Sequence, residues 1–194
     1  MSKVIFDMSM SLDGFVRAPN NTPEEPLGAG GQRLHDWALD PADPSGGELL
    51  ERGATALGAC VCGRRTYEDS LPFWGANGPT GDRRLPLFAL THEVPSDVPE
   101  GSVYTFVTDG PESALRQARA AAGGGDIGIM GSDVGRQFIE AGLVDEISVH
   151  VVPVLFGGGL RMFEHLGGGY VDLEVIEVIE SKTATHLRYR VAKK

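Results

Sequence analysis

Short apolar runs alternate with segments of helical periodicity along the chain. Five of the runs have the length and composition of strands, and they lie at residues 3–10, 86–90, 103–107, 127–130 and 146–152. A sixth run, residues 54–62, consists of small apolar residues, which predicts a strand buried on both faces. Residues 111–122 form the clearest predicted helix, because Pro111 stands at its start and Gly123 follows its end.

Further helices are predicted between the strands. They occupy residues 34–39, ended by Pro41 and Pro44, and residues 47–52, and two more open at Gly63 and Gly131. The last two runs, residues 171–179 and 185–191, alternate apolar and polar positions, as half-exposed antiparallel strands do. This order predicts a single domain over residues 1–194 of the α/β class, with a mixed, mostly parallel sheet between helices and antiparallel C-terminal strands.

One predicted loop is unusually long. Residues 17–32 are rich in Pro, Asn and Gly and show no periodicity. Loops of more than about 12 residues in a compact domain are usually functional or disordered. This loop follows the first strand, where it is placed to act as a lid over a cleft.

Composition and charge narrow the functional classes. The 194 residues are 41% hydrophobic and 23% charged, as in a globular protein, and no run approaches the roughly 18 apolar residues of a membrane span. The net charge of −10 disfavours general binding to nucleic acids or membrane surfaces. The N-terminus lacks the features of a secretory signal, and Cys60 and Cys62 share one strand face as expected of buried thiols. We therefore expect a cytoplasmic protein.

Three polar motifs follow predicted strands. They are Gly63-Arg64-Arg65-Thr66, Thr91-His92 and Gly131-Ser132-Asp133-Val134-Gly135. A helix that starts after a Gly turn presents free backbone N–H groups and a positive dipole end to a phosphate, and Ser132 or Asp133 is a candidate cap. Each motif alone is also compatible with an ordinary capped turn and solvated arginines.

Together the motifs predict a dinucleotide site. Ligands of such sheets bind outside the carboxyl ends of the strands, where all three motifs fall. The common G-x-G-x-x-G fingerprint of nicotinamide-binding proteins is absent near the first strand. Thr91 and His92 stand where an acid would hold a ribose hydroxyl, which favours NADP over NAD.

The motifs resemble those of two related families. Residues 63–68, GRRTYE, resemble the G-R-x-T-[WY]-E helix start of dihydrofolate reductases. Residues 8–16, MSMSLDGFV, resemble the S-L-D-G signature of the riboflavin-pathway reductase domain, which is the C-terminal domain of the bifunctional deaminase-reductase. Residues 144–147 and 153–159, VDEI and PVLFGGG, resemble the same group. The resemblance covers essentially the whole chain and is greatest to the stand-alone members, which implies a dihydrofolate reductase-like α/β/α fold.

The resemblance also implies a cofactor, NADPH, and a set of residues that bind it. Cofactor phosphates are implied at Gly63, Arg64, Arg65 and Thr66, and the adenosine phosphate side at Thr91 and His92. Pyrophosphate is implied at residues 131–135, and the nicotinamide at Met8 and Ser9. Members of the group are commonly homodimers, and the long apolar C-terminal strands are candidates for that interface.

The proton donor is the least certain part of the site. Asp13 and Asp36 are the candidates, although a turn carboxylate and a solvated helix residue are the ordinary alternatives. His150 either faces the pocket or is a satisfied core histidine, and the second alternative is favoured. No histidines have the spacing of a metal motif such as H-E-x-x-H, so no metal is expected.

Two functions remain open. The first is an NADPH-dependent reductase of a small heterocyclic, pterin- or pyrimidine-like, or carbonyl substrate, similar to 5-amino-6-(5-phosphoribosylamino)uracil reductase or dihydrofolate reductase. The second is a nucleotide- or pterin-binding module of the same fold without turnover. Residues 132–133 replace further glycines of dihydrofolate reductases, and no H-x-E…P-C-x-x-C deaminase pattern occurs.

Overall fold

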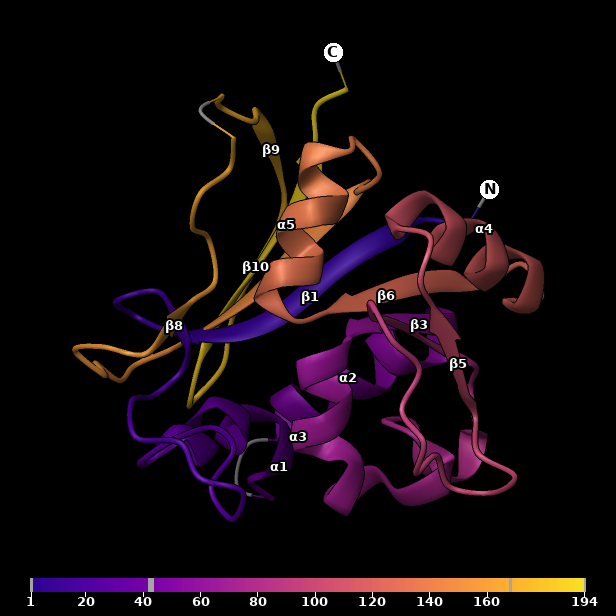
Figure 1. Ribbon diagram of the computed structural model, residues 1–194. Helices are drawn as coiled ribbons and strands as arrows, with labels where there is room; N and C mark the ends of the chain where they lie inside the picture. The colour runs from indigo at the N-terminus through magenta and orange to yellow at the C-terminus, as the bar shows by residue number, and fades with distance from the viewer. Residues whose placement is uncertain (1, 42–43, 168, 194) are drawn as a thin grey trace. The chain divides into compact units, whose positions relative to one another are not determined.

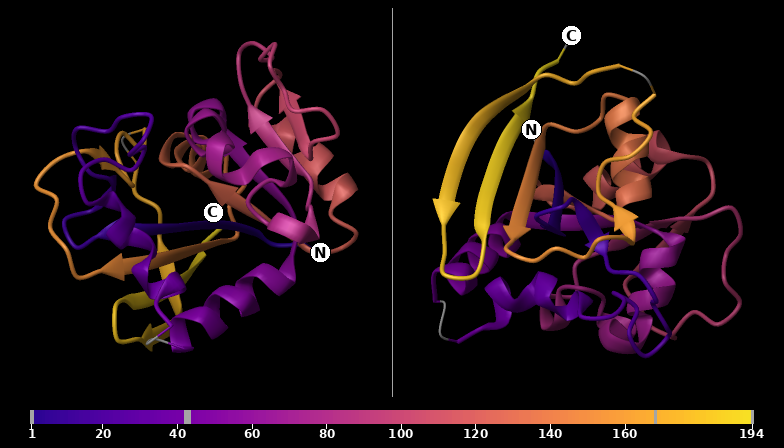
Figure 2. Two further views of the ribbon diagram at one scale, coloured as in Figure 1. Left: turned by 90° about the horizontal axis from the view of Figure 1, so that it is seen from below. Right: turned by 90° about the vertical axis from the view of Figure 1, so that its left-hand side faces the viewer.

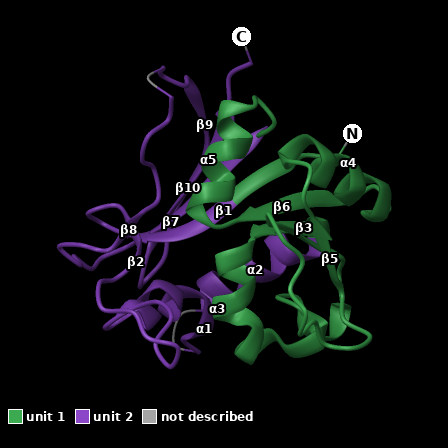
Figure 3. Ribbon diagram, in the orientation of Figure 1, with its two compact units in different colours: residues 1–6, 56–144 green, residues 7–55, 145–194 purple. Residues whose placement is uncertain are grey.

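The computed structural model describes residues 2–41, 44–167 and 169–193, and these form two compact units (Figure 3). Unit 1 contains the chain up to Phe6 together with Ala56–Val144. Unit 2 contains Asp7–Thr55 together with the chain from Asp145 onward. The strand β1 (Val4–Ser11) contributes its first three residues to unit 1 and the rest to unit 2.

Unit 1 is a parallel sheet with helices on both faces (Figure 1). Its strand order is β5-β4-β3-β6-β1, and each neighbouring pair is parallel. The strands besides β1 are β3 (Leu57–Gly63), β4 (Leu87–Leu90), β5 (Tyr104–Val107) and β6 (Asp126–Met130). The helices are α3 (Arg64–Trp74), α4 (Pro111–Ala121) and α5 (Ser132–Glu140), with short 3-10 turns η2 (Gly75–Asn77) and η3 (Gly81–Arg83).

The core of unit 1 follows from the alternation of side chains along β3. Cys60 and Cys62 point to one face, where they pack with Tyr67 of α3. Val61, on the opposite face, is fully buried, and α4 and α5 both contact β3. Gly135 of α5 lies so close to the Phe6 ring that an added Cβ would come within 2.3 Å of it. A glycine is therefore required there for the helix to reach the sheet.

Unit 2 is built on antiparallel strands. β7 (Glu146–Val152) pairs with β10 (Thr185–Val191), which also pairs with β9 (Leu173–Glu180), and β9 and β10 run side by side (Figure 2). The strand β7 follows β1 in the sheet order, so β9 is an outermost strand. The other elements are the ribbon β2 (Phe15–Arg17) with β8 (Leu160–Arg161), the turn η1 (Gly31–His35), and the helices α1 (Asp36–Leu39) and α2 (Pro44–Ala56).

The predicted fold class is confirmed, with corrections to some boundaries. The eight-stranded sheet is mostly parallel and carries antiparallel C-terminal strands, as expected. However, Pro44 begins α2 rather than ending the preceding helix, because proline is tolerated in the first turn, where its missing N–H has no partner to lose. The helix α2 also continues to Ala56, so the buried strand starts at Leu57 and not at residue 54. The ribbon of β2 and β8 was not predicted.

The predicted long loop is closed by its own backbone. The N–H groups of Ala18 and Ala29 donate to the carbonyls of Leu27 and Pro19 at 2.8 and 3.1 Å. Gly28 has φ +76°, and an added Cβ would lie 2.2 Å from the Ala18 carbonyl oxygen. The predicted loop also ends earlier than residue 32, because η1 begins at Gly31.

Candidate functional site

The three predicted phosphate motifs converge in unit 1. The strand β3 lies between β4 and β6 and is parallel to both. These strands end at Gly63, Leu90 and Met130, so the residues that follow them come out at the same edge of the sheet. The structure thereby brings together the segments that the sequence analysis identified separately.

The starts of α3 and α5 lie directly against each other. Gly131 has φ +93°, a conformation that favours glycine, and an added Cβ would lie 2.6 Å from Thr66 Oγ1. An added Cβ at Gly63 would lie 3.1 Å from Val134 Cγ2. The two glycines therefore allow the two helix N-termini to adjoin with backbone groups at their junction.

Both helices begin without a side-chain cap. Gly63 and Gly131 occupy the N-cap positions, and neither helix has a side-chain cap hydrogen bond. Expecting Ser132 or Asp133 to cap α5 was therefore wrong, because the helix already begins at Ser132. The N–H of Gly135 donates to Gly131 O at 2.9 Å, so the N–H groups of residues 132–134 lie ahead of the first intrahelical bond. Such a turn can receive a phosphate.

Arg64 links α3 to the turn after β4. Its Nε donates to Glu68 Oε1 at 2.7 Å, and its Nη1 donates to the Glu93 carbonyl oxygen at 3.1 Å. The same carbonyl accepts the Thr91 hydroxyl at 2.6 Å, which fixes the turn that carries His92. The neighbouring carboxylate of Glu68 raises the pKa of Arg64, so the guanidinium stays charged. A guanidinium that is paired with Glu68 thus lies at the start of α3.

The remaining predicted residues of unit 1 differ in accessibility. Arg65, His92 and Asp133 are exposed, whereas Thr91 and Ser132 are buried. Val134 and Gly135 are also buried, so they would offer a ligand backbone groups rather than side chains. Asp133 is the acidic residue in the first turn of α5, and its carboxylate lies 3.9 Å from the Arg136 guanidinium.

Asp13, in unit 2, anchors a loop. Its carboxylate accepts the Ser11 hydroxyl at 2.6 Å and the N–H groups of Phe156 and Gly157 at 3.2 and 2.8 Å. The hydrogen bond from Ser11 and those from the two N–H groups lower the pKa of Asp13 below its usual value of 3.8. An ionised carboxylate with three donors is suited to holding the 153–159 segment, and it has no proton to give near neutral pH.

The other predicted residues of unit 2 lie on β1 and α1. Asp36 is exposed, and the residue of α1 that packs inward is its neighbour Trp37. The Trp37 indole Nε1 donates to Ser9 Oγ at 2.8 Å, so the Ser9 hydroxyl faces α1. Met8 is half-buried and, being the next residue of the strand, points to the opposite face from Ser9.

His150 belongs to a buried polar cluster that the sequence analysis identified only in part. Its Nδ1 lies 2.7 Å from His186 Nδ1, and its Nε2 lies 3.3 Å from Asp7 Oδ1. His150 is a buried, hydrogen-bonded histidine, as its favoured alternative stated. His186 and Asp7 were missed, because only the pairing of β7 with β10 places the two histidines opposite each other.

The described residues contain neither a group of side chains suited to a metal ion nor a helix suited to a membrane. Within residues 2–41, 44–167 and 169–193, no three or more His, Cys, Asp or Glu side chains are grouped to hold a metal ion. Across the same described part of the chain, no helix has the length and apolar character needed to cross a membrane.

Comparison with known proteins identifies relatives of the fold. The family model described as the RibD C-terminal domain matches residues 2–187. No curated protein matches the chain. Among solved structures, a putative riboflavin biosynthesis protein from Shewanella sp. PV-4 is 23% identical, with full coverage of both chains and a TM-score of 0.71.

Two further solved structures extend the comparison. The Thermotoga maritima diaminohydroxyphosphoribosylaminopyrimidine deaminase/5-amino-6-(5-phosphoribosylamino)uracil reductase is 15% identical, with a TM-score of 0.65 over 98% of this chain and 57% of its own. Dihydrofolate reductase from Enterococcus faecalis, in complex with NADP(H) and RAB-propyl, is 14% identical, with a TM-score of 0.58 over 98% of this chain and 97% of its own. These likenesses establish the dihydrofolate reductase-like fold.

Proposed function

Because the chain belongs to the RibD C-terminal domain family, we propose that it is an NADPH-dependent reductase of a small heterocyclic or carbonyl substrate. Membership of this family supports a reductase-type role. The proposal adds to that role a cofactor, NADPH, and a class of substrate. The observation that carries the cofactor is the junction of two uncapped helix N-termini beside Arg64.

The residues at this junction fit a dinucleotide phosphate. An added Cβ at Gly131 would meet Thr66 Oγ1 at 2.6 Å, so the glycine keeps the Thr66 hydroxyl against the start of α5. The N–H groups of residues 132–134 have no intrahelical acceptor. Thr66 would add a hydroxyl donor, and Arg64 a guanidinium that suits the 2′-phosphate of NADPH. These groups supply local positive potential in a chain whose net charge is −10.

In the proposed reaction, the cofactor and the protein supply different groups. NADPH, when bound, supplies a hydride to the substrate. The protein binds the phosphates through residues 63–66 and 131–135 and must provide one proton to the reduced product. Asp13 already accepts three hydrogen bonds, so that proton has to come from another group.

Cofactor titration tests the proposal directly. Binding of NADPH and NADH is followed by calorimetry, and oxidation is then assayed with 5-amino-6-(5-phosphoribosylamino)uracil, a pterin and a small aldehyde. The first of these is the substrate named for the Thermotoga relative. We expect NADPH to bind more tightly than NADH and to be oxidised with one member of the panel. Absence of NADPH binding at millimolar concentration would contradict the proposal.

Replacing Arg64 tests how the 2′-phosphate is held. We expect Arg64→Ala to weaken NADPH binding about 10- to 100-fold, which corresponds to the loss of a charged hydrogen bond worth roughly 1.5–3 kcal/mol. NADH, which lacks that phosphate, should lose far less. Arg119→Ala, an exposed change on α4, is the control and should leave both affinities unchanged. Equal losses for the two cofactors would refute the assignment.

A binding module without turnover is the second candidate function. The observation that favours it is that one predicted proton donor, Asp13, is a loop anchor, while the other, Asp36, is an exposed helix residue. This candidate predicts NADPH binding in calorimetry without oxidation by any member of the substrate panel. Turnover with any of them would exclude it.

We further propose a homodimer through the outer strand of unit 2. The exposed apolar side chains Val175, Ile176 and Val178 lie on β9, which ends the strand order of the sheet. A second copy presents the same exposed apolar side chains on the same outer strand, so the surface can pair with itself about a two-fold axis. Sedimentation at micromolar concentration should show a dimer, and a monomer alone would contradict this interface.

A further inference from the structure

Two partners within unit 1 hold the guanidinium of Arg64. Its Nε donates to Oε1 of Glu68, one helical turn further along α3, at 2.7 Å. Its Nη1 donates to the carbonyl oxygen of Glu93, in the turn after β4, at 3.1 Å. The two contacts come from different elements of the same unit, so together they restrict the orientation of the guanidinium.

Three of the five N–H groups of Arg64 remain available to a ligand. A guanidinium has five N–H donors in one plane, and the two contacts use one hydrogen on Nε and one on Nη1. Nη2 has no hydrogen-bond partner within residues 2–41, 44–167 and 169–193. Because the side chain is 42% exposed, a phosphate can bind these donors while both internal contacts persist.

Thr91 has no hydrogen left to donate to a phosphate. The residue is buried, and its hydroxyl donates to the Glu93 carbonyl oxygen at 2.6 Å and accepts from the Glu93 N–H at 3.2 Å. The N–H of Thr91 donates to the Val107 carbonyl oxygen at 3.0 Å, which ties the turn to the end of β5. A hydroxyl carries one hydrogen, so Thr91 supports the turn and does not donate to a ligand.

The Glu93 carbonyl connects Thr91 to Arg64. Its oxygen accepts both the Thr91 hydroxyl and the Nη1 of Arg64, and a carbonyl oxygen has two lone pairs for these two donors. The buried hydroxyl thus holds the carbonyl, and the carbonyl holds one side of the exposed guanidinium. We call Glu68, Thr91 and the Glu93 carbonyl the Arg64 clamp.

Glu68 has a second effect, because its carboxylate is charged. Its hydrogen bond and its charge raise the pKa of Arg64, and the charges of Glu93 and Asp97 act in the same direction. The same negative charges repel a phosphate that approaches the guanidinium. The side chains of Arg64 and Glu68 are 42% and 50% exposed, so water and salt weaken this repulsion without removing it.

We infer that the Arg64 clamp sets how strongly the protein prefers NADPH to NADH. This inference rests on the proposed function, because it needs the 2′-phosphate of NADPH to bind Arg64. Thr91 is a positioning residue that strengthens the preference by holding Arg64 through the Glu93 carbonyl. Glu68 weakens the preference, because its carboxylate offsets the charge that the 2′-phosphate meets. NADH has a hydroxyl in place of this phosphate, so the ratio of the two dissociation constants isolates the effect of the clamp.

Calorimetric titration of Thr91 variants tests the positioning. Thr91→Val keeps the shape of the side chain without its hydroxyl. We expect it to weaken NADPH binding about 3- to 10-fold, the scale of one hydrogen bond, with little change for NADH. Thr91→Ser keeps the hydroxyl and should retain the wild-type ratio. Thr105→Val, the same change at an exposed position of β5, is the control and should also retain that ratio.

A double variant distinguishes positioning from an effect that bypasses Arg64. If Thr91 acts through the guanidinium, Thr91→Val should not weaken NADPH binding further once Arg64→Ala has removed that group. Equal weakening by Thr91→Val in the presence and in the absence of Arg64 would overturn the positioning role.

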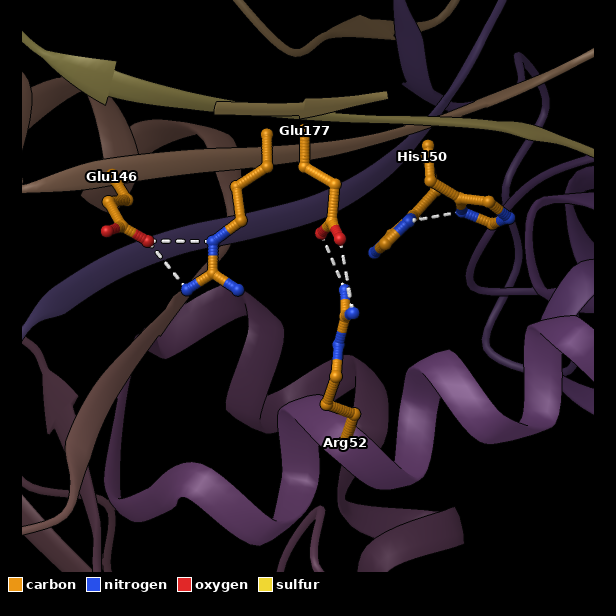
Figure 4. Close-up of polar contacts among 6 residues, drawn as sticks. Arg52, Glu146, His150 and Glu177 are labelled. Carbon is orange, nitrogen blue, oxygen red and sulfur yellow. Dashed lines mark hydrogen bonds and ion pairs between the residues drawn. The ribbon is translucent and has the colours of Figure 1, made fainter. Parts of the chain in front are cut away.

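Glu68→Gln tests the opposing effect. The amide oxygen can still accept from Arg64, but the negative charge is removed. At low salt NADPH should bind about 2- to 5-fold more tightly, the range of an exposed ion pair, and NADH should be unaffected. Glu177→Gln alters the exposed Arg52–Glu177 pair of unit 2 (Figure 4) and is the matched control, with no change expected for either cofactor. Unaltered or weaker NADPH binding in Glu68→Gln would contradict the inference.

The possible failures are distinct. Because an exposed ion pair contributes little to stability, Glu68→Gln tests the clamp even where Thr91→Val does not fold. Absence of NADPH binding by the wild type would defeat the proposed function and this inference with it. Wild-type binding of NADPH, with an unchanged cofactor ratio in Thr91→Val and in Glu68→Gln, would defeat the clamp alone.

Discussion

At the scale of single residues, the same carboxylate can serve chemistry or architecture, and its hydrogen-bond donors distinguish the two. Asp13 lies in the S-L-D-G signature, which made it a candidate proton donor, yet it accepts one hydroxyl and two backbone N–H groups. A catalytic acid needs a pKa close to the working pH. The donors around Asp13 lower its pKa, which favours a structural role in holding the 153–159 segment.

Replacing Asp13 by Asn should lower the unfolding midpoint at pH 7. The amide keeps one oxygen but turns an NH₂ group toward backbone donors. Because the folded state lowers the pKa, the wild-type advantage is present above the usual value of 3.8 and is lost as the pH falls through the lower folded value. Thermal unfolding at pH 7 and pH 3 checks this, with Asp133→Asn, whose side chain is 83% exposed, as the control. A constant difference between the two pH values would contradict it.

Gly131→Ala should be more destabilising than Gly142→Ala. Both glycines have positive φ, +93° and +67°, and each alanine costs on the order of 1–2 kcal/mol for that conformation alone. Only at Gly131 does the new Cβ meet another group, Thr66 Oγ1 at 2.6 Å, whereas nothing lies within 4 Å at Gly142. Denaturant unfolding measures the difference, and calorimetry should show weaker NADPH binding for Gly131→Ala only. Equal effects of the two variants would refute the close junction.

At the scale of elements, the local sequence pattern predicted those features of strands and helices that depend on residues close together in the chain. The apolar runs and the glycine at each helix start were sufficient to place the strand ends that carry Arg64, Thr91 and Ser132. The start of α2 was misassigned, because proline both ends and begins helices. The pairing of His150 with His186 depends on the register of strands that are distant in sequence, and no local pattern specifies that register.

The outer strand β9 gives a prediction at the same scale. Val178→Lys places a charge on a side chain that is 60% exposed at the centre of the proposed interface. We expect the variant to sediment as a monomer at concentrations where the wild type is a dimer, with an unchanged circular dichroism spectrum. Val94→Lys, on an exposed loop residue of unit 1, is the control and should remain dimeric. A dimeric Val178→Lys protein would exclude this interface.

At the scale of the whole molecule, net charge sets the background for ligand binding. The charge of −10 opposes any phosphorylated cofactor, so the local groups at the starts of α3 and α5 must overcome it. Those groups exist only in the folded chain, because they depend on helix starts from different parts of the sequence. Cofactor binding should therefore be linked to folding.

NADPH should accordingly stabilise the protein against unfolding. At a free concentration 100 times its Kd, a ligand that binds only the folded state adds about 2.7 kcal/mol to the free energy of unfolding. Differential scanning fluorimetry with NADPH, with NADH at the same concentration and with Arg64→Ala checks this. The wild type with NADPH should show the largest shift, and no shift at saturating NADPH would contradict specific binding to the folded state.

The strand β1, which contributes to both units, is synthesised long before the strand of unit 1 that it pairs with. Val4 pairs with Ile127 and Phe6 with Ile129, so β1 leaves the ribosome well before its partner β6, which lies far downstream. At roughly 5–20 residues per second, the nascent strand waits on the order of 6–25 s for that partner to be synthesised. During that time Val4, Ile5 and Phe6, all buried in the finished protein, are an apolar segment that a chaperone can bind.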